Sequence, residues 1–306
     1  MLNDLRYALR QQLKSPGFTF VAVLTLALGI GANSAIFSVI DAVLLRSLPF
    51  PNPDRLTMLW GSSPQHPEND KQVHSYPDYL DLRARNHTFT ALAAYTRASA
   101  IWGTGEGSED VPGLATTADI FTVLGTRPLL GRGFSRDDDK EEAARVVVIS
   151  HSFWQRHFAA DPGIIGKQVT LAGKVHTVTG VMPPGWKFPI QNENVDYIAP
   201  LTPLFAGQTP NYMDRRGAHF LAVVGRLRPG VDLKTATADL QMIAAQLAKQ
   251  YPETDAGRSE RPVTLKSDLV GDVKPALLVL IGAVTLVLLI ACANVANLFL
   301  ARAATR

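Results

Sequence analysis

Two long apolar stretches without any charged residue dominate the hydrophobic pattern of this 306-residue chain, one near each end. They run from Ser15 to Ile40 and from Pro275 to Ala301. Each is long enough to cross a bilayer as a helix, because about 20 residues at ~1.5 Å per residue span a hydrocarbon core of about 30 Å. We therefore predict transmembrane helices over residues 18–45 and 275–301, separated by a folded domain over residues 46–274.

The segment before the first apolar stretch has the pattern of an amphipathic helix. Its leucines recur every three or four residues, with basic side chains between them. The leucines are Leu2, Leu5, Leu9 and Leu13, and the basic residues are Arg6, Arg10 and Lys14. Such a helix rests its apolar side on a membrane and turns its basic side toward water and anionic lipid. We predict that residues 1–17 form a cytoplasmic amphipathic helix, which either sets the topology or docks a cytoplasmic partner.

The folded domain begins with the pattern of a strand, a helix and two further strands. The strands are predicted over Leu56–Trp60, Ala91–Ile101 and Asp110–Thr116. Ser75 and Asp78 have the spacing of a capping box, so we expect a helix that starts there and runs to about Arg85.

A similar order of elements recurs near the end of the domain. His219–Leu227 and Pro262–Lys266 have the pattern of strands. Between them a helix is predicted to begin at Asp232 and to stop before Pro252. Its apolar face is made of Leu233, Ala236, Leu240, Ile243 and Leu247. Two strand-helix-strand units at opposite ends of the domain indicate one α+β subdomain built from both ends.

The middle of the domain is rich in valine and threonine and favours strands. The predicted strands are Arg145–Ile149, Gln168–Ala172 and Lys174–Val181, and the last two flank Gly173 as in a short hairpin. We predict an inserted β-rich subdomain over about residues 125–215. The fold class expected from the pattern is thus an α+β domain of split strand-helix-strand units with a β-rich insertion, flanked by two transmembrane helices.

The charges next to the apolar stretches predict the orientation of the chain. Basic residues outnumber acidic ones before the first stretch, and Arg302 and Arg306 follow the second. Because positive flanks stay in the cytoplasm, both ends are expected there, with a cytoplasmic tail over 302–306 and residues 46–274 on the other side. A cleaved signal peptide is the alternative for the first stretch, although its apolar region is normally only about 7–15 residues long.

The charge and cysteine content of the folded domain bear on the kinds of molecule it binds and on its disulfides. Residues 46–274 hold equal numbers of basic and acidic side chains, so the basic isoelectric point comes from the membrane flanks and gives no support to nucleic-acid binding. The single cysteine, Cys292, lies in the second apolar stretch, so the folded domain contains no disulfide. Asn33, Asn294 and Asn297 also lie in the apolar stretches, where an unpaired amide is costly, so we expect hydrogen bonds between helices.

Motifs that resemble nucleotide or calcium sites favour a structural interpretation. Gly163-Ile164-Ile165-Gly166-Lys167-Gln168 lacks the spacing and the hydroxyl of a phosphate-binding loop, so any ATPase is a separate protein. Asp137-Asp138-Asp139 lacks the alternating ligands of a calcium loop and is expected to be a solvated turn. Gly103, Gly105 and Gly107 open no helix and are expected to form a flexible loop, without the role of a dinucleotide site.

The histidines and serines give no stronger signal. His151 and His157 are not at metal-ligand spacing, and Ser150 lacks the flanking glycines that expose a nucleophile. We therefore predict no catalytic residue, no cofactor-binding residue, no cofactor and no metal ligand. Enzymatic activity is not expected.

A series of short motifs resembles the MacB/FtsX family of ABC-transporter permeases, most closely its long duplicated orphan-permease branch. Before the folded domain these are Asp4-Leu5-Arg6-Tyr7-Ala8-Leu9-Arg10 and Ala27-Leu28-Gly29-Ile30-Gly31-Ala32-Asn33. Inside it they are Leu48-Pro49-Phe50, Pro53-Asp54-Arg55-Leu56, Tyr76-Pro77-Asp78-Tyr79, Gly131-Arg132-Gly133-Phe134, Val148-Ile149-Ser150, Phe153-Trp154 and Gly180-Val181-Met182-Pro183-Pro184-Gly185. After it comes Ala291-Cys292-Ala293-Asn294-Val295-Ala296-Asn297-Leu298. Each motif is loose, but their order along the chain is specific.

The resemblance implies a membrane subunit of the mechanotransmission type, which moves a periplasmic domain in response to a cytoplasmic ATPase. The implied partners are a separate ABC ATPase, a second permease copy or homodimer, membrane lipid and, in members that serve efflux, a periplasmic adaptor. The implied location is the bacterial inner membrane, multi-pass, with residues 46–274 in the periplasm as a MacB-like core domain. The implied fold is a split porter subdomain with an inserted β-rich subdomain.

Family members carry four spans per unit, three of them after the periplasmic domain, whereas this sequence has one apolar stretch there. The sequence therefore predicts a permease that is truncated after its second span, at the start of its FtsX-like permease domain. Two alternatives are a two-span receptor or sensor with an extracytoplasmic ligand-binding domain, and a non-functional permease fragment.

Overall fold

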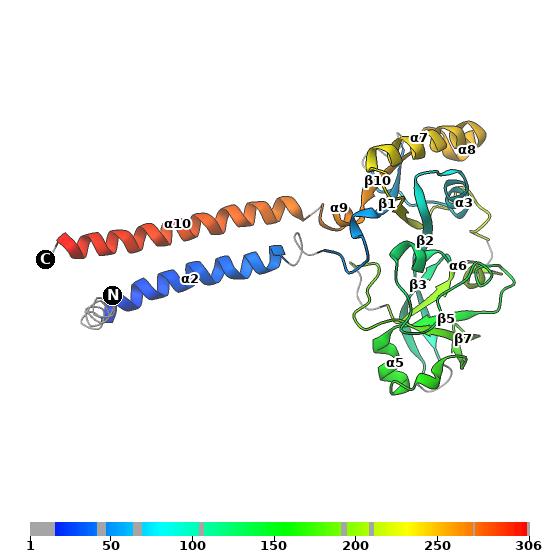
Figure 1. The fold of residues 1–306 in the computed structure, drawn as a ribbon, viewed down its shortest axis with the longest axis horizontal. Coiled ribbons are helices and arrows are strands. Elements are labelled where there is room, and N and C mark those ends of the chain that lie inside the picture. Colours follow the sequence, from blue (N-terminus) through cyan, green and yellow to red (C-terminus); the bar gives the residue numbers. More distant parts are fainter. Residues whose placement is uncertain are drawn as a thin grey trace. The chain divides into compact units, whose positions relative to one another are not determined.

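The computed structural model describes residues 16–41, 47–63, 69–103, 107–190, 195–207, 211–271 and 273–304 (Figure 1). The chain forms two compact units. One is the α/β unit, Leu48–Leu269, and the other is the helical unit made of Met1–Ser47 and Val270–Arg306. The predicted amphipathic helix over residues 1–17 lies almost wholly outside the described residues.

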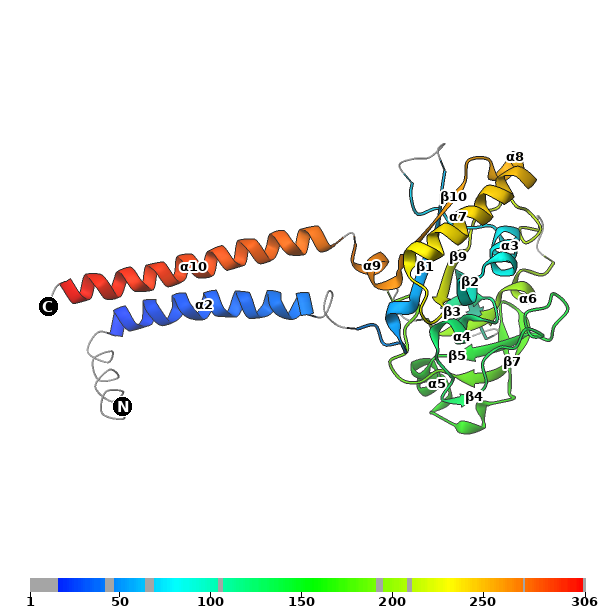
Figure 2. The same ribbon diagram turned by 45° about the horizontal axis from the view of Figure 1, so that its top comes forward.

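The helical unit consists of two long helices, α2 (Pro16–Ile40) and α10 (Lys274–Ala304), which lie side by side (Figures 1 and 2). The Asn33 amide donates to the Gly29 carbonyl at 2.8 Å and across to the Val284 carbonyl at 3.3 Å. The predicted bond between helices is thus present at Asn33.

Only one described helix is long and apolar enough to cross a membrane, and it is the Lys274–Asn297 part of α10. In α2 the apolar stretch Val23–Ser38 is shorter than that requirement. The first of the two predicted spans therefore remains a prediction. Asn294 and Asn297 are exposed on α10, unlike Asn33.

Two interleaved split strand-helix-strand motifs form the first part of the α/β unit. They are β1 (Leu56–Ser62), α3 (Tyr76–Arg85), β2 (Phe89–Trp102), and β9 (Ala222–Leu227), α7 (Leu233–Gln250), β10 (Ser259–Thr264). The sheet order is β10-β1-β9-β2 with antiparallel neighbours, so each motif places its two strands around one strand of the other. The predicted α+β subdomain built from both ends is confirmed.

The helices begin where the capping residues predicted. The Ser75 side chain accepts from the Asp78 amide at 3.2 Å, and the Asp232 side chain accepts from the Thr235 amide at 2.8 Å. Apolar residues of α3 and α7 pack on the sheet face that carries Leu59, while the adjacent Met58 points to the core on the opposite face.

Two strand predictions need correction. β9 begins at Ala222, because His219 and Phe220 belong to a segment that crosses over to His74. β10 ends at Thr264, where the hydroxyl oxygen accepts from the Ser267 amide at 3.2 Å and the chain turns into α9 (Leu265–Val270). Two short helices accompany these elements, η2 (Pro53–Arg55) and α8 (Pro252–Asp255).

The second part of the α/β unit closes into a ring of strands. Its strands are β3 (Glu109–Thr116), β5 (Val146–Ile149), β6 (Gln168–Leu171), β7 (Lys174–Val181) and β8 (Tyr197–Pro200), together with the later half of β2. Pairing runs β2-β3-β8-β5-β7-β6 and returns to β2 through Trp102 and Leu171. The predicted hairpin is confirmed, since β6 and β7 pair around Ala172-Gly173.

Helices as well as strands occur in the stretch predicted to be a β-rich insertion. Its remaining elements are β4 (Leu130–Gly131), α5 (His151–Phe158), η3 (Pro162–Ile164) and α6 (Leu201–Phe205), and α4 (Ile120–Leu124) precedes it. Because β2 is long, it pairs with β9 in its first half and with β3 in its second, and this joins both parts into one sheet. The bounds of the insertion remain a prediction.

Candidate functional site

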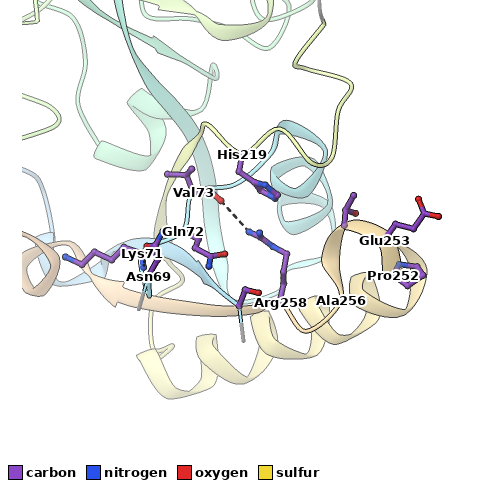
Figure 3. Close-up of a pocket in the computed structure, with 11 residues that line it drawn as sticks. Asn69, Lys71, Gln72, Val73, His219, Pro252, Glu253, Ala256 and Arg258 are labelled. Carbon is purple, nitrogen blue, oxygen red and sulfur yellow. Dashed lines mark hydrogen bonds between the residues drawn. The ribbon is translucent and has the colours of Figure 1, made fainter. Parts of the chain in front are cut away.

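A polar pocket of about 410 Å³ lies where α8 faces the segment that follows β1 (Figure 3). Gln72, His219, Thr254 and Arg258 contribute to its lining. In Figure 3 the Arg258 side chain reaches toward Val73 and His219, and it donates to the Val73 carbonyl over 3.4 Å. The Gln72 Nε2 atom is buried without a hydrogen-bond partner in the described part of the chain, whereas the His219 Nε2 atom lies 3.4 Å from an Asp78 carboxylate oxygen. The pocket therefore offers one polar group, the Gln72 amide, that the described protein atoms leave unsatisfied.

Beside this pocket, a single guanidinium gathers three carboxylates. Arg216 lies 2.6 Å from Asp78, 2.6 Å from Asp81 and 3.4 Å from Asp255, measured between nitrogen and oxygen. Its planar group also stacks on the Tyr251 ring, 3.7 Å from the centroid. The contacts tie together α3, α8 and the segment that leads into β9.

The pKa values of two aspartates in this Arg216 network shift in opposite directions. Burial works to raise the pKa of Asp78, but His219, Ser75 and Arg216 together hold that pKa below its usual range. Burial and the neighbouring Asp78 carboxylate raise the pKa of Asp255. The neighbours of Asp78 thus stabilise its charged form, whereas the charged form of Asp255 is destabilised by burial and by the Asp78 carboxylate.

The contacts of the Arg216 network are ion pairs and one cation–ring contact between separate elements. Among the described residues no group of three or more histidine, cysteine, aspartate or glutamate side chains is arranged to hold a metal ion. The sequence identifies Asp78 only as a helix-capping position and gives no hint of Arg216. The two residues are 138 positions apart, and local spacing carries no signal over that distance.

The Ser150 and histidine motifs separate in the fold. Ser150 caps α5 by accepting from the Phe153 amide at 3.1 Å. His151 contacts the Trp154 ring, whereas His157 pairs with Glu109 at 2.9 Å. These residues do not converge on one site.

The glycine-rich and acidic motifs form ordinary turns. Asp161 accepts from the Gly163 amide and pairs with Lys167, both at 2.8 Å, so the turn has a carboxylate where a phosphate loop would bind its ligand. In the acidic run, Asp138 pairs with Arg132, whereas Asp139 is half-buried and its carboxylate accepts from the Ala118 and Thr202 amides, so the run is not wholly the solvated turn that the sequence predicts. Burial raises the pKa of Asp139. Of the three predicted loop glycines, Gly105 lies outside the described residues.

The Gly-Arg-Gly-Phe motif has a packing explanation. Gly131 has a positive φ of 70°, and a Cβ there would overlap the Thr179 carbonyl. A Cβ at Gly133 would lie 2.5 Å from the Phe121 ring, which also packs edge to face against Phe134 with centroids 5.3 Å apart. The motif therefore marks close approach of backbone segments and not a ligand site.

A mixed α/β domain, joined in one chain to a helix able to cross a membrane, defines a membrane-embedded protein with a domain outside the bilayer. The model of the MacB-like periplasmic core domain family matches residues 19–243. The chain belongs to this family, as the sequence motifs predicted.

Two solved structures show the same fold at low sequence identity. The periplasmic region of MacB from Actinobacillus actinomycetemcomitans is 15% identical with a TM-score of 0.52, and the match covers 72% of this chain and 92% of that one. A domain of a putative permease from Porphyromonas gingivalis is 15% identical with a TM-score of 0.51, covering 71% and 92%. No curated protein sequence is a detectable relative of this chain.

Proposed function

We propose that this chain is a membrane permease subunit of an ABC transporter of the MacB/FtsX mechanotransmission type. The chain lies in the inner membrane. Its α/β unit is in the periplasm, where it engages partner proteins or export substrates. A separate cytoplasmic ATPase supplies the motion, because the chain carries no phosphate-binding loop of its own.

The observation that carries this proposal is the position of the family match. It begins at residue 19, inside the apolar helix α2, and continues through the α/β unit into α7. The match thus takes in an apolar helix and the domain after it, and the apolar helix α10 follows. This order, an apolar helix, the domain and a further apolar helix, matches the first part of a permease of this type and supports the proposal.

Co-purification tests the proposal. The tagged full chain is extracted from membranes of its source organism in mild detergent, and bound proteins are identified by mass spectrometry. We expect an ABC ATPase to be enriched over a control in which an unrelated tagged membrane protein is extracted in parallel. Recovery of the chain with no ABC ATPase under any mild extraction condition would contradict the proposal.

A further inference from the structure

A second cavity of about 580 Å³ lies between α3 and the start of β2, so it shares α3 with the Arg216 network but has a different lining. Three arginines and one aspartate line it: Arg83, Arg136, Arg228 and Asp119. We refer to it as the arginine groove. Its charged lining comes from three different parts of the fold, so the groove exists only in the folded domain.

The single carboxylate does not balance the three guanidinium groups. Asp119 is shared between Arg83, at 2.8 Å, and Arg136, at 3.7 Å. Arg228 donates its Nε to the Phe89 carbonyl at 3.1 Å and meets no carboxylate within the described ranges. The groove therefore carries surplus positive charge that points to an anionic occupant.

Two further arginines of this region, Arg226 and Arg55, do not line the groove and are held by backbone carbonyls. Arg226 is 8% exposed, and its guanidinium is held by backbone carbonyls, including that of Val123 at 2.6 Å. Arg55 also donates to a backbone carbonyl, that of Leu227. Burial and then the nearby Arg55 charge lower the pKa of Arg226.

The groove also has an apolar wall. Leu80 on α3 is 40% exposed although it is a large aliphatic side chain, and Ala84 and Ala91 line the same cavity. A small inorganic anion would leave this wall uncovered. A chain segment that alternates acidic and apolar side chains would meet both the guanidinium groups and the apolar wall.

We propose that the arginine groove binds an acidic segment of a partner protein, with its carboxylates on Arg83, Arg136 and Arg228 and an apolar side chain against Leu80. This inference rests on the proposed function, because it assigns the partner-binding role of the periplasmic domain to one surface. It names the chemistry of the partner as a carboxylate-rich, partly apolar polypeptide.

Binding of a labelled synthetic peptide of alternating glutamate and leucine to the full chain in detergent tests this inference. We expect saturable binding that weakens with salt, and about tenfold weaker binding in Arg228→Glu and in Arg136→Glu. Arg136 is suited to this because its side chain is 77% exposed, so its reversal leaves the core intact. The matched control is Lys234→Glu, an exposed position in the first turn of α7, which changes the net charge equally.

Three results would overturn the inference. They are no binding of the peptide by the wild type, equal weakening in Lys234→Glu, and peptide binding that both groove variants retain. Vesicles with and without phosphatidylglycerol form a second arm. Binding to anionic vesicles that the groove variants lose, without peptide binding, would assign the groove to lipid instead. Because the groove variants should still co-purify with the ATPase, failure here and failure of the proposed function are distinguishable.

Discussion

At the residue scale, Arg216 contacts three aspartates whose carboxylates lie at different distances from its guanidinium. Asp78 is 5% exposed and Asp255 is 3% exposed, so neither carboxylate can rely on water for its charge. Asp78 has a close guanidinium contact at 2.6 Å, whereas the Asp255 contact is longer, at 3.4 Å. Against the effect of burial, hydrogen bonds from His219 and Ser75, and then the Arg216 charge, lower the pKa of Asp78, whereas burial and the Asp78 charge raise the pKa of Asp255.

The two pKa shifts give the free energy of unfolding opposite dependences on pH. The pKa of Asp78 is lowered on folding, so its contribution to stability is present above the usual aspartate range and is lost as pH falls through the folded pKa. The pKa of Asp255 is raised on folding, so the folded state loses stability as pH rises from the usual range through the raised value.

We predict that Asp78→Asn is more destabilising than Asp255→Asn at pH 7. Loss of the buried ion pair at Asp78 should cost about 1–3 kcal/mol, and the asparagine keeps the backbone amide that caps α3 on Ser75. Asp255→Asn removes a carboxylate that is poorly compensated and should cost less. Thermal unfolding of the full chain in detergent at pH 7 and at pH 4 measures both.

The difference between the two variants should shrink at pH 4, because Asp255, whose pKa is raised, takes up a proton there, while Asp78, whose pKa is lowered, keeps most of its charge. Equal destabilisation at pH 7, or a difference that widens in acid, would contradict the assignment of the Arg216 network. Asp81→Asn serves as a comparison. The Asp81 carboxylate contacts Arg85 at 3.0 Å as well as Arg216, so it does not depend on Arg216 alone.

At the scale of elements, α9 is held to the sheet by one directed contact. The Trp60 indole donates to the Asp268 carboxylate at 2.8 Å, and Lys71 approaches the same carboxylate at 3.4 Å. Leu265 is buried in the core below. These contacts accompany the helix that follows β10, in a segment whose local sequence favours a continuing strand.

We predict that Trp60→Phe loosens α9 without unfolding the domain. The ring volume is largely kept but the hydrogen bond is lost, at about 0.5–1.5 kcal/mol. Amide hydrogen exchange, read by mass spectrometry, should become several times faster in a peptide that covers Leu265–Val270. The control is Trp186→Phe, because the Trp186 Nε1 atom is buried without a hydrogen-bond partner in the part of the chain that the structure describes. Unchanged exchange in Trp60→Phe, or equal acceleration in both variants, would show that the bond does not hold α9.

Secondary structure was predictable where its signals are local. The caps at Ser75 and Asp232, the hairpin around Gly173 and the apolar face of α7 all depend on residues within about one turn of each other. α9 was not predicted: the Thr264 hydroxyl that accepts from the Ser267 amide is a local signal, but the contact of α9 with Trp60, 208 positions from Asp268, is not visible in the sequence.

At the scale of the whole molecule, the orientation predicted from the basic flanks remains to be measured. A Cys292→Ser background removes the single native thiol. New cysteines are then placed at Glu253, exposed on α8, and at Arg306 at the end of the chain. We expect a membrane-impermeant maleimide added to intact spheroplasts to label the cysteine at position 253, and to label position 306 only after lysis. Labelling of position 306 in intact spheroplasts, or protection of position 253, would reverse the orientation.

The sequence by itself determined the apolar helices, the order of most strands and helices, and the family, because each follows from hydrophobic period, capping residues or short motifs. Only the tertiary structure decided the closure of the strand ring at Trp102, the Arg216 network and the arginine groove. The physical reason is that these features join side chains from distant parts of the chain. Their energies depend on burial and charge proximity, which exist only after the sheet has formed.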